Sequence, residues 1–494
     1  MSFLCLTILL SAASPRAATF NVLDYDADPS GANWSTRAIQ KAIDACTGAG
    51  GGAVRFPRGR YRIAPLVLKD NVTLQFERDT FLDAPRSYRE YVPFKSLIRA
   101  TGARNVALRG PVVIEGHGAD FWSVTANPTT WYQESQSRPS PLVQFRNCSN
   151  VVVEGITIAN SPSWALSPYS CTNVTIANVT ITNDYYGPNT DGIDICQSQN
   201  VLITGCRVAT GDDTIAIKNL APTAAENVTR RVVVTNCDLT TPSYALKIGT
   251  ESRVGVIEDI LFTDCRARAN RHDLGMHAGI ALQSVDGGTL RNVRVNRIQI
   301  EDARSPIFLR LGNRGTGQSL SPPVPGRIQD ILIENVTATA ATTQREFGVQ
   351  IHGLPGTPIT NLTLRNLRLI SRGDVRLSHL KVAAISELAV PEKHAAYPSV
   401  EMFGWLPAFG LYARHVQGLT LQNLELLAQN SDVRPALALD DVSALTIQNV
   451  TARHPGSESR PAASLHHVTR SPGLVLTAQP HPNGPTAGWL LATP

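Results

Sequence analysis

A short phrase recurs along this chain: a polar residue that is usually Asn, a few alternating β-branched or aliphatic residues, and a polar turn. Neighbouring copies lie about 23 to 31 residues apart through the middle of the chain. Period-two alternation repeated at this spacing is typical of a parallel β-solenoid, whose rungs bury their apolar faces by stacking about 4.8 Å apart. We therefore predict an all-β fold, a right-handed parallel β-helix. The copies begin at Asn71, Asn105, Asn150, Asn173, Asn200, Asn292, Asp330, Asn361, Gly418 and Ala444, or end at Cys237 and Cys265.

The rival fold is an antiparallel β-sandwich, which would show tight hairpin turns such as Asn-Gly between its strands. Such turns are scarce here, so the solenoid is preferred. The cysteines also follow the repeat, because three close a Thr-x-Cys phrase and three precede an Asn-Val start. We predict buried, mostly reduced thiols that stack in ladders, rather than metal ligands. They are Cys206, Cys237 and Cys265 in the first group, and Cys148, Cys171 and Cys196 in the second.

Two regions depart from the rungs. Residues 20–62 include the segment T-R-A-I-Q-K-A-I-D-A-C, whose apolar period of three to four predicts an amphipathic helix that caps the open end of the solenoid. Residues 384–416 form a long segment rich in aromatic residues and Pro, which is more often a binding loop than a passive connection. We expect one catalytic β-helix domain over residues 19–494.

The start of the chain resembles a secretion signal. Phe3 to Ala13 form a short apolar stretch that ends in small residues, so we expect residues 1–18 to be a signal peptide and the protein to be secreted or periplasmic. No later stretch reaches the roughly 18 apolar residues of a membrane-spanning helix, so no membrane partner is expected. The net charge of +5 over 494 residues, with no Lys/Arg run, disfavours nucleic-acid binding.

Four acidic residues crowd two consecutive rungs. Asp191 and Asp194 lie in N-T-D-G-I-D, and Asp212 and Asp213 lie in T-G-D-D-T-I-A-I-K. Each phrase alone is an ordinary turn. Their spacing of about one rung predicts that they stack on one face, where repulsion and desolvation raise the pKa of at least one carboxyl. A proton donor beside ionised bases is what a glycosidase needs, although clustered carboxylates also suit a Ca²⁺ site.

At these residues the sequence resembles glycoside hydrolase family 28, the polygalacturonase family. The family motif Asn-x-Asp followed by Gly-Asp-Asp is matched by N-T-D at residues 189–191 and by G-D-D at residues 211–213. The likeness extends to the opening F-N-V-L-D-Y-D-A, to the capping segment and to N-S-P-S-W before Cys171. It implies inverting hydrolysis, with Asp212 as general acid, Asp191 and Asp213 activating water, and Asn189 orienting the site. Asp194 would serve this network or bond to backbone.

Two further family motifs are not matched. Ser243, Tyr244 and Ala245 stand where the family usually has Gly-His-Gly, so the histidine that assists the acid is missing unless His277 or His272 reaches in. Ala281, Leu282 and Gln283 stand where the family has Arg-Ile-Lys, which holds the galacturonate carboxylate. Each lost charge-assisted contact is worth roughly 1.5–3 kcal/mol, which puts ordinary polygalacturonase activity in doubt.

Other residues are candidates for holding the sugar. Lys247 and Arg310 could replace the lost cations or be solvated charges. Aromatic residues of the 384–416 loop could stack on sugar rings, although Phe409 and Tyr412 are expected to pack the loop onto the solenoid. The predicted substrate-binding residues are Asn189, Lys218, Tyr244, Lys247, His277, Gln283, Arg310, Glu401 and Trp405.

The sequence therefore predicts an O-glycosyl hydrolase that acts by inversion on a pectin-like or related polysaccharide, with Asp191, Asp212 and Asp213 as its catalytic residues. No cofactor is expected, and the chemistry requires no metal. Two alternatives stay open: a polysaccharide lyase on the same fold, for which Lys218 is the one candidate base near the acids, and a glycan-binding β-helix without turnover. The oligomeric state is not predicted.

Overall fold

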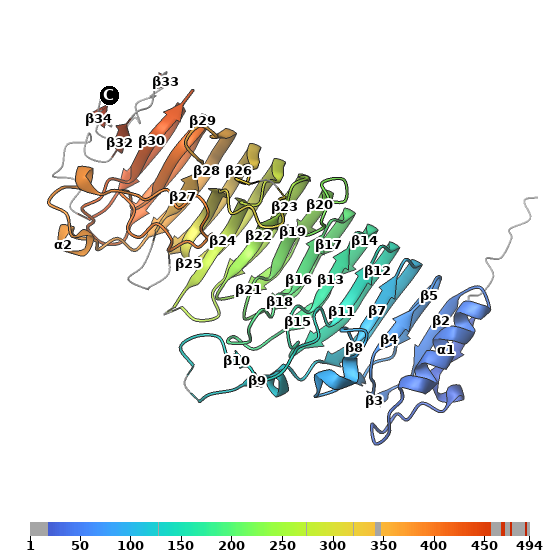
Figure 1. Ribbon diagram of the computed structural model, residues 1–494. Coiled ribbons are helices and arrows are strands. Elements are labelled where there is room, and N and C mark those ends of the chain that lie inside the picture. Colours follow the sequence, from blue (N-terminus) through green and yellow to red (C-terminus); the bar gives the residue numbers. More distant parts are fainter. Residues whose placement is uncertain are drawn as a thin grey trace, which may run out of the picture.

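The computed structural model describes residues 18–126, 128–272, 274–319, 321–340 and 347–455, together with the backbone of three short strands near the C-terminus. The signal peptide expected over residues 1–18 thus lies almost wholly outside the described residues. Figure 1 shows the strands stacked in chain order along one long axis, with helix α1 (Thr36–Gly48) at one end and the C-terminal strands at the other. The architecture is the parallel β-helix that the repeat predicts.

The strands form three parallel stacks, and several long strands bend from one stack into the next. Stack 1 contains β4 (Leu66–Leu68), β7 (Ile98–Thr101), β11 (Val143–Arg146), β13 (Leu166–Tyr169), β16 (Ile193–Cys196), β19 (Ile215–Asn219), β22 (Tyr244–Ser252), β24 (Met276–Ser284), the end of β25 (Thr289–Leu311), β27 (Val349–His352), the start of β29 (Leu411–Ala428), β30 (Leu437–Ser443), β32 (His466–Thr469) and β34 (Leu490–Leu491).

Stack 2 contains β1 (Thr19–Asn21), β2 (Gly52–Phe56), β5 (Val72–Phe76), the starts of β8 (Arg104–Glu115) and β12 (Ser149–Ala159), β14 (Thr172–Ala177), β17 (Gln199–Thr204), β20 (Val228–Thr235), the starts of β23 (Val256–Arg268), β25, β26 (Arg327–Ala340) and β28 (Ile359–Ser371), the middle of β29, the start of β31 (Thr446–Arg453), and β33 (Val475–Leu476).

Stack 3 contains β3 (Gly59–Arg62), β6 (Thr80–Asp83), β15 (Thr180–Thr182), β18 (Arg207–Ala209), β21 (Asp238–Thr240) and the later parts of the long strands. The remaining elements lie between rungs. They are η1 (Val22–Tyr25), η2 (Tyr88–Tyr91), η3 (Gly118–Phe121), the antiparallel pair β9 (Trp122–Ser123) and β10 (Gln133–Glu134), α2 (Leu377–Leu380) and η4 (Ile385–Glu387).

The asparagines that open the repeated phrase stand at the corner where each rung enters stack 2. Asn150 and Asn173 have φ values of 55° and 56°, in the left-handed region that Asn tolerates better than most residues. Their amides also form a ladder: Asn150 donates to Asn105 (2.9 Å), Asn173 to Asn150 (3.0 Å) and Asn200 to Asn173 (2.9 Å). The same side chain thus permits the turn and links neighbouring rungs.

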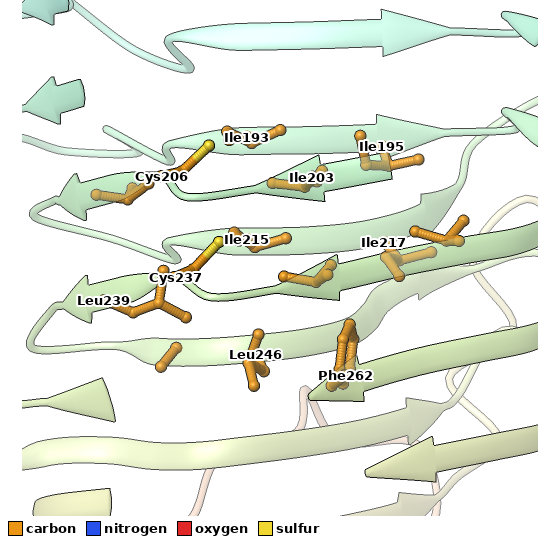
Figure 2. Close-up of a cluster of buried hydrophobic side chains, with 14 of the residues drawn as sticks. Ile193, Ile195, Ile203, Cys206, Ile215, Ile217, Cys237, Leu239, Leu246 and Phe262 are labelled. Atoms are coloured by element: carbon orange, nitrogen blue, oxygen red, sulfur yellow. The ribbon is translucent and has the colours of Figure 1, made fainter. Parts of the chain in front are cut away.

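The interior between the stacks is one continuous apolar core. Figure 2 shows why: Ile193, Ile215 and Leu246 come from consecutive rungs and lie in line, so that equivalent inward positions stack on one another. At the N-terminal end of the solenoid, α1 buries Ile39 and Ile43 against this core. The predicted capping helix is therefore confirmed.

The seven described cysteines are buried and free. Cys206 and Cys237 lie one above the other in the core, as predicted, and Cys265 continues their position on the next rung. The prediction that the second group of cysteines stacks in one ladder was wrong for Cys196. The backbone N–H of Cys171 donates to Ser198 (3.0 Å), so Ser198 holds the position equivalent to Cys171, whereas Cys196 lies within β16.

The 384–416 loop covers the outer face of stack 1. A second apolar cluster forms there from loop residues such as Val400, Phe403 and Leu406, and from outward-facing strand residues such as Phe308 and Tyr412. Tyr412 therefore packs the loop onto the solenoid, as expected. Among the described helices, none has the length and apolar character of a membrane span.

Candidate active site

The acidic residues of the two consecutive rungs lie where turns lead into stack 1. Asp191 stands two residues before β16, and Asp212 and Asp213 stand shortly before β19. The backbone N–H of Gly192 donates to the carbonyl of Asp213 (2.9 Å), which places the two turns in register. One carboxylate oxygen from each of the three aspartates consequently lies within 4.8 Å of the other two.

These carboxylates face a cavity of about 340 Å³. Lys218 and Lys247, which line it, alternate along β19 and β22 with the core residues Ile217 and Ile248, so its floor is the outer face of stack 1. The lining residues are Trp131, Trp164, Asn189, Asp191, Asp212, Asp213, Lys218, Ser243, Tyr244, Lys247, Glu251, His277, Tyr397, Pro398 and Ser399.

Asp213 is held as a carboxylate. Lys247 lies 2.7 Å from its Oδ2, and the Ser243 hydroxyl donates to its Oδ1 (2.9 Å). Burial acts to raise the pKa of Asp213, but attraction to Lys247 and Lys218 and the two hydrogen bonds outweigh it, and the pKa lies below its ordinary value. Ser243 stands at the first position of the three that match Gly-His-Gly, and Tyr244 stands at the histidine position, so this motif still contacts the acidic cluster through Ser243.

Asp212 is held in the opposite way. It has no basic partner among the described residues, and its Oδ1 accepts one hydrogen bond, from the backbone N–H of Asp213 (2.9 Å). Burial, and then the charges of Asp191 and Asp213, raise the pKa of Asp212 well above its ordinary value. At 8% exposure it is nonetheless the most accessible of the three aspartates. The cavity therefore contains a carboxyl that favours the protonated form beside one that favours the ionised form.

A second lysine, Lys218, contacts the other acidic residues of the site. The Lys218 ammonium lies 3.1 Å from Asp191, 2.8 Å from Asp194 and 3.9 Å from Glu251, and it also packs over the Trp164 ring at 3.9 Å. Burial raises the pKa of Asp191 despite Lys218, and raises that of Asp194 well above its ordinary value. Asp194 is fully buried and does not line the cavity, so it contacts the cluster through Lys218.

Several other predicted residues line the cavity as well. The amide oxygen of Asn189 accepts a hydrogen bond from Arg138 (3.1 Å), which fixes its orientation. The ring centroids of Tyr244 and His277 lie 5.4 Å apart. Burial, and then repulsion from Arg304, lower the pKa of His277 to about 4, so this ring is neutral at ordinary pH. The other histidine considered, His272, contacts Asp302 instead.

Four predicted substrate-binding residues do not line the cavity. Gln283 is buried and accepts a hydrogen bond from Thr250 (3.3 Å). Arg310 is buried beneath the 384–416 loop, where its Nη2 donates to the carbonyls of Glu392 (3.0 Å) and Lys393 (2.8 Å).

The remaining two belong to the loop itself. Glu401 pairs with Arg304, and the Trp405 ring lies 6.5 Å from that of His379. These contacts hold the loop in place. The part of the loop that reaches the cavity is instead Tyr397 with Pro398 and Ser399.

Seven lining residues were not among the predicted site residues: Ser243, the loop residues Tyr397, Pro398 and Ser399, and three more, Trp131, Trp164 and Glu251. Trp164 could have been predicted, because it belongs to the N-S-P-S-W motif noted above, one rung before Asp191. The backbone N–H of the next residue, Ala165, donates to the carbonyl of Asp191 (2.9 Å), which places the two rungs in register. Glu251 lies on β22 beyond Lys247 and had no distinguishing signal. Trp131 comes from the long excursion between β8 and β11, outside the repeat, and its indole N–H donates to the carbonyl of Gly211 (3.0 Å).

The three aspartates could also be considered as ligands for a metal ion. Calcium needs six to eight oxygen ligands at about 2.3–2.6 Å. Here Lys218 and Lys247 already pair with Asp191 and Asp213, and a cation would have to displace these ammonium groups or bind against their charge. The arrangement favours acid–base chemistry over metal binding.

Comparison with known proteins bears on this geometry. A model of the family described as glycosyl hydrolases family 28 matches residues 46–388 of this chain. The matched segment includes Asp191, Asp212 and Asp213 as well as both cavity lysines. It ends before Tyr397, Pro398 and Ser399, so this wall of the cavity lies outside the match.

Individual relatives agree with the family match. A probable polygalacturonase of Arabidopsis thaliana is 26% identical over 305 residues, which cover 59% of this chain and 62% of the relative, a little less than two thirds of its length. An exopolygalacturonase of Zea mays is 26% identical over 370 residues, which cover 72% of this chain and 85% of the relative.

Solved structures show the same fold. The exopolygalacturonase of Thermotoga maritima superposes with a TM-score of 0.56 at 23% identity, covering 72% of this chain and 87% of that one. A family 28 exopolygalacturonase of Yersinia enterocolitica gives a TM-score of 0.61 at 19% identity, covering 94% and 79%. The neighbours are right-handed parallel β-helices, the handedness predicted for this chain.

Proposed function

This chain belongs to family 28 of the glycosyl hydrolases, and from that premise we propose that it hydrolyses a pectin-like or related polysaccharide in the cavity around Asp212. It is a glycoside hydrolase with polygalacturonase-like relatives. The substrate and the roles of individual residues are proposals. One observation carries them: of two adjacent carboxyls in one cavity, Asp213 contacts Lys247 and Ser243, whereas Asp212 meets a backbone N–H. The pKa is accordingly lowered for Asp213 and raised for Asp212.

Asp212 is the general acid. Its raised pKa keeps a proton available at a pH where an ordinary carboxyl has lost it, and its 8% exposure lets that proton reach a glycosidic oxygen. The developing positive charge at the sugar is stabilised by the neighbouring carboxylates. Asp212 is deprotonated as the leaving group takes the proton, and the base is protonated by the attacking water. Exchange with solvent then returns a proton to Asp212 and removes one from the base before the next turnover.

Asp213 is the principal base, with Asp191 beside it. Asp213 is ionised by its pairing with Lys247 and by the Ser243 hydroxyl, so it can accept a proton from water. Asp191, held by Lys218, provides a second oxygen to orient that water. Asn189, fixed by Arg138, lies at the edge of this arrangement and orients the substrate.

We propose inversion of the anomeric carbon on the basis of the family resemblance and not of the carboxylate separation. Inverting glycosidases usually hold their two carboxyls about 6.5–9.5 Å apart, and retaining ones about 5–5.5 Å. One oxygen from each of the three carboxyls lies within 4.8 Å of the others here, which is a separation of single atoms and not of the carboxyl groups that those ranges describe. The stereochemical outcome therefore needs its own measurement.

The test uses wild type, Asp212→Asn and a control, Asp264→Asn, whose exposed carboxylate pairs with Arg297 outside the cavity. Reducing-sugar release is measured across pectic and neutral glycans, and proton NMR identifies the anomer of the first product. Asp212→Asn should lower kcat by about 10²–10⁴-fold, because the amide cannot donate the proton. The control should keep wild-type activity, and the first product should be the inverted anomer.

Other outcomes identify the alternatives. Products that absorb in the ultraviolet as unsaturated uronates would indicate a lyase, although Lys218 is a poor base for one because Asp191 and Asp194 raise its pKa well above the ordinary value against the effect of burial. Sugar binding without any hydrolysis would indicate a glycan-binding protein. Equal rates for wild type and Asp212→Asn would contradict the assigned acid.

Secretion or export to the periplasm is also part of the proposal. It rests on the apolar stretch from Phe3 to Ala13. Expression of the full chain, followed by N-terminal sequencing of exported protein, would identify a cleavage site near residue 18 if the expectation is right.

A further inference from the structure

We propose that the sugar unit held in this cavity is uncharged, so that the enzyme cleaves beside a neutral or esterified sugar rather than a free uronate. The inference rests on the hydrolase function above and narrows its substrate. It comes from the positive charges around the cavity, each of which already has a partner within the protein.

Lys218 and Lys247 are the lysines that line the cavity, and no arginine is among the described lining residues. Lys247 lies 2.7 Å from Asp213 and 4.5 Å from the Tyr244 ring centre. Lys218 contacts Asp191 and Asp194 and packs on a tryptophan. A uronate carboxylate would have to take one of these ammonium groups away from an aspartate, and in doing so disturb the catalytic cluster.

The negative charges leave no surplus of positive charge. Asp213 and Glu251 both have lowered pKa values, because attraction to the lysines outweighs burial, and they already balance the two ammonium groups. Asp191 adds a further carboxyl to the same cavity, and the histidine there, His277, is neutral. A substrate carboxylate would therefore enter among like charges in a partly desolvated space, which is unfavourable.

The cations that could have replaced the family's Arg-Ile-Lys are used elsewhere. Ala281 and Gln283 stand at that motif and are themselves buried. Arg310 follows Gln283 on the next strand, β25, and Arg414 lies two strands further in the same stack, on β29, but both are at most 1% exposed. Their guanidinium groups hold the 384–416 loop through the backbone carbonyls of residues 390–393.

The walls that remain are aromatic. Trp131, Trp164, Tyr244 and Tyr397 all line the cavity, and the Tyr397 side chain is more than half exposed. Aromatic faces contact the C–H faces of sugar rings without needing a charge on the sugar. A neutral hexose or pentose, or a uronate whose carboxyl is esterified, fits these walls and this charge balance.

The first experiment measures binding and so does not depend on turnover. The full-length Asp212→Asn variant is titrated with a galacturonate trimer, with the same trimer methyl-esterified, and with the same trimer reduced to neutral galactose. Intrinsic tryptophan fluorescence, to which Trp131 and Trp164 of the cavity contribute, reports binding. We expect the free acid to bind about tenfold or more weakly than either neutral form at low salt. Equal or tighter binding of the free acid would overturn the inference.

The second experiment adds a charge to the cavity wall. Ser399 lines the cavity and its hydroxyl accepts a hydrogen bond from the backbone of Glu401 (3.3 Å). Ser399→Lys and Ser399→Met lose that bond equally, but only the lysine adds an uncommitted cation. Ser399→Lys should shift the preference by about tenfold toward the free acid relative to Ser399→Met. The same preference in both variants would overturn the explanation by charge.

Hydrolysis by wild type on the three polymers completes the test. Faster cleavage of the esterified or reduced polymer supports the inference, and faster cleavage of free polygalacturonate overturns it while leaving the hydrolase function intact. If no trimer binds and no polymer is cleaved, both proposals fail. The two proposals can therefore fail separately.

Discussion

Asp212 and Asp213 are neighbours in sequence and differ in chemistry because of what each side chain meets. Asp213 contacts Lys247 and Ser243, whereas the side chain of Asp212 accepts a hydrogen bond from the backbone N–H of Asp213. The rung spacing predicted that these carboxyls would meet Asp191. It could not predict which one is ionised, because the deciding partner is Lys247, which stands 34 residues further along the chain.

Replacing Lys247 should change the pH dependence of the enzyme. In the proposed mechanism activity needs ionised Asp213 and protonated Asp212, so kcat/KM should rise as pH passes the lowered pKa of Asp213 and fall as pH passes the raised pKa of Asp212. In Lys247→Met the pKa of Asp213 rises, because burial is no longer offset by this ammonium group. The acidic limb of the profile should then move to higher pH.

The control for this prediction is Lys69→Met, which removes an exposed ion pair with Asp44 and should leave the profile unchanged. The measurement is kcat/KM against pH for all three proteins, on the substrate found above. An acidic limb that stays in place in Lys247→Met would show that another group acts as the base.

At the scale of elements, the segment predicted as a loop over residues 384–416 ends earlier than expected, because β29 begins at Leu411, and its residues were assigned partly wrong roles. Outward-facing strand positions have the same sequence pattern whether a loop covers them or solvent does. Arg310 therefore looked like a candidate for the substrate, although the structure shows it holding the loop by two backbone carbonyls. Tyr397 lies four residues after Lys393 and lines the cavity. We infer that anchoring the loop at Lys393 helps to position Tyr397 in the cavity wall.

Arg310→Met should loosen this anchor while filling much of the same volume. We expect KM to rise about three- to tenfold with a smaller change in kcat, because the wall at Tyr397 positions the substrate but does not take part in proton transfer. Steady-state kinetics measure both constants. Arg297→Met, which removes an exposed pair with Asp264, is the matched control. A fall in kcat at unchanged KM would assign Arg310 a different role.

At the scale of the whole molecule, the fold was predictable because the same pattern of alternating apolar residues recurs in many rungs. Each rung contributes an alternating apolar face, and on several consecutive rungs an Asn at the corner adopts positive φ and bonds to the Asn of the neighbouring rung. One ambiguous rung matters little when its neighbours agree. The loops between rungs do not repeat, so no pattern predicted Trp131, which lies in such a loop and lines the cavity.

The Asn ladder makes a prediction about stability. Asn173→Ala removes bonds to Asn150 and Asn200 and places Ala at φ 56°, which should cost about 1–3 kcal/mol. Asn173→Gly loses the same bonds but tolerates the backbone angle, so it should cost less. Denaturation midpoints in urea compare the three proteins. A larger loss for Gly than for Ala would show that the backbone angle is not an important part of the ladder's contribution.

The aspartates proposed to be catalytic occupy two adjacent rungs, and this has a consequence for how such a protein can change its length. Inserting or deleting a whole turn of the helix elsewhere lengthens or shortens the molecule by about 4.8 Å and leaves the spacing of Asp191 and Asp212 untouched. A turn inserted between them would separate them by that distance and end their cooperation. The number of turns can thus change without changing the active site, except between the rung of Asp191 and the rung of Asp212.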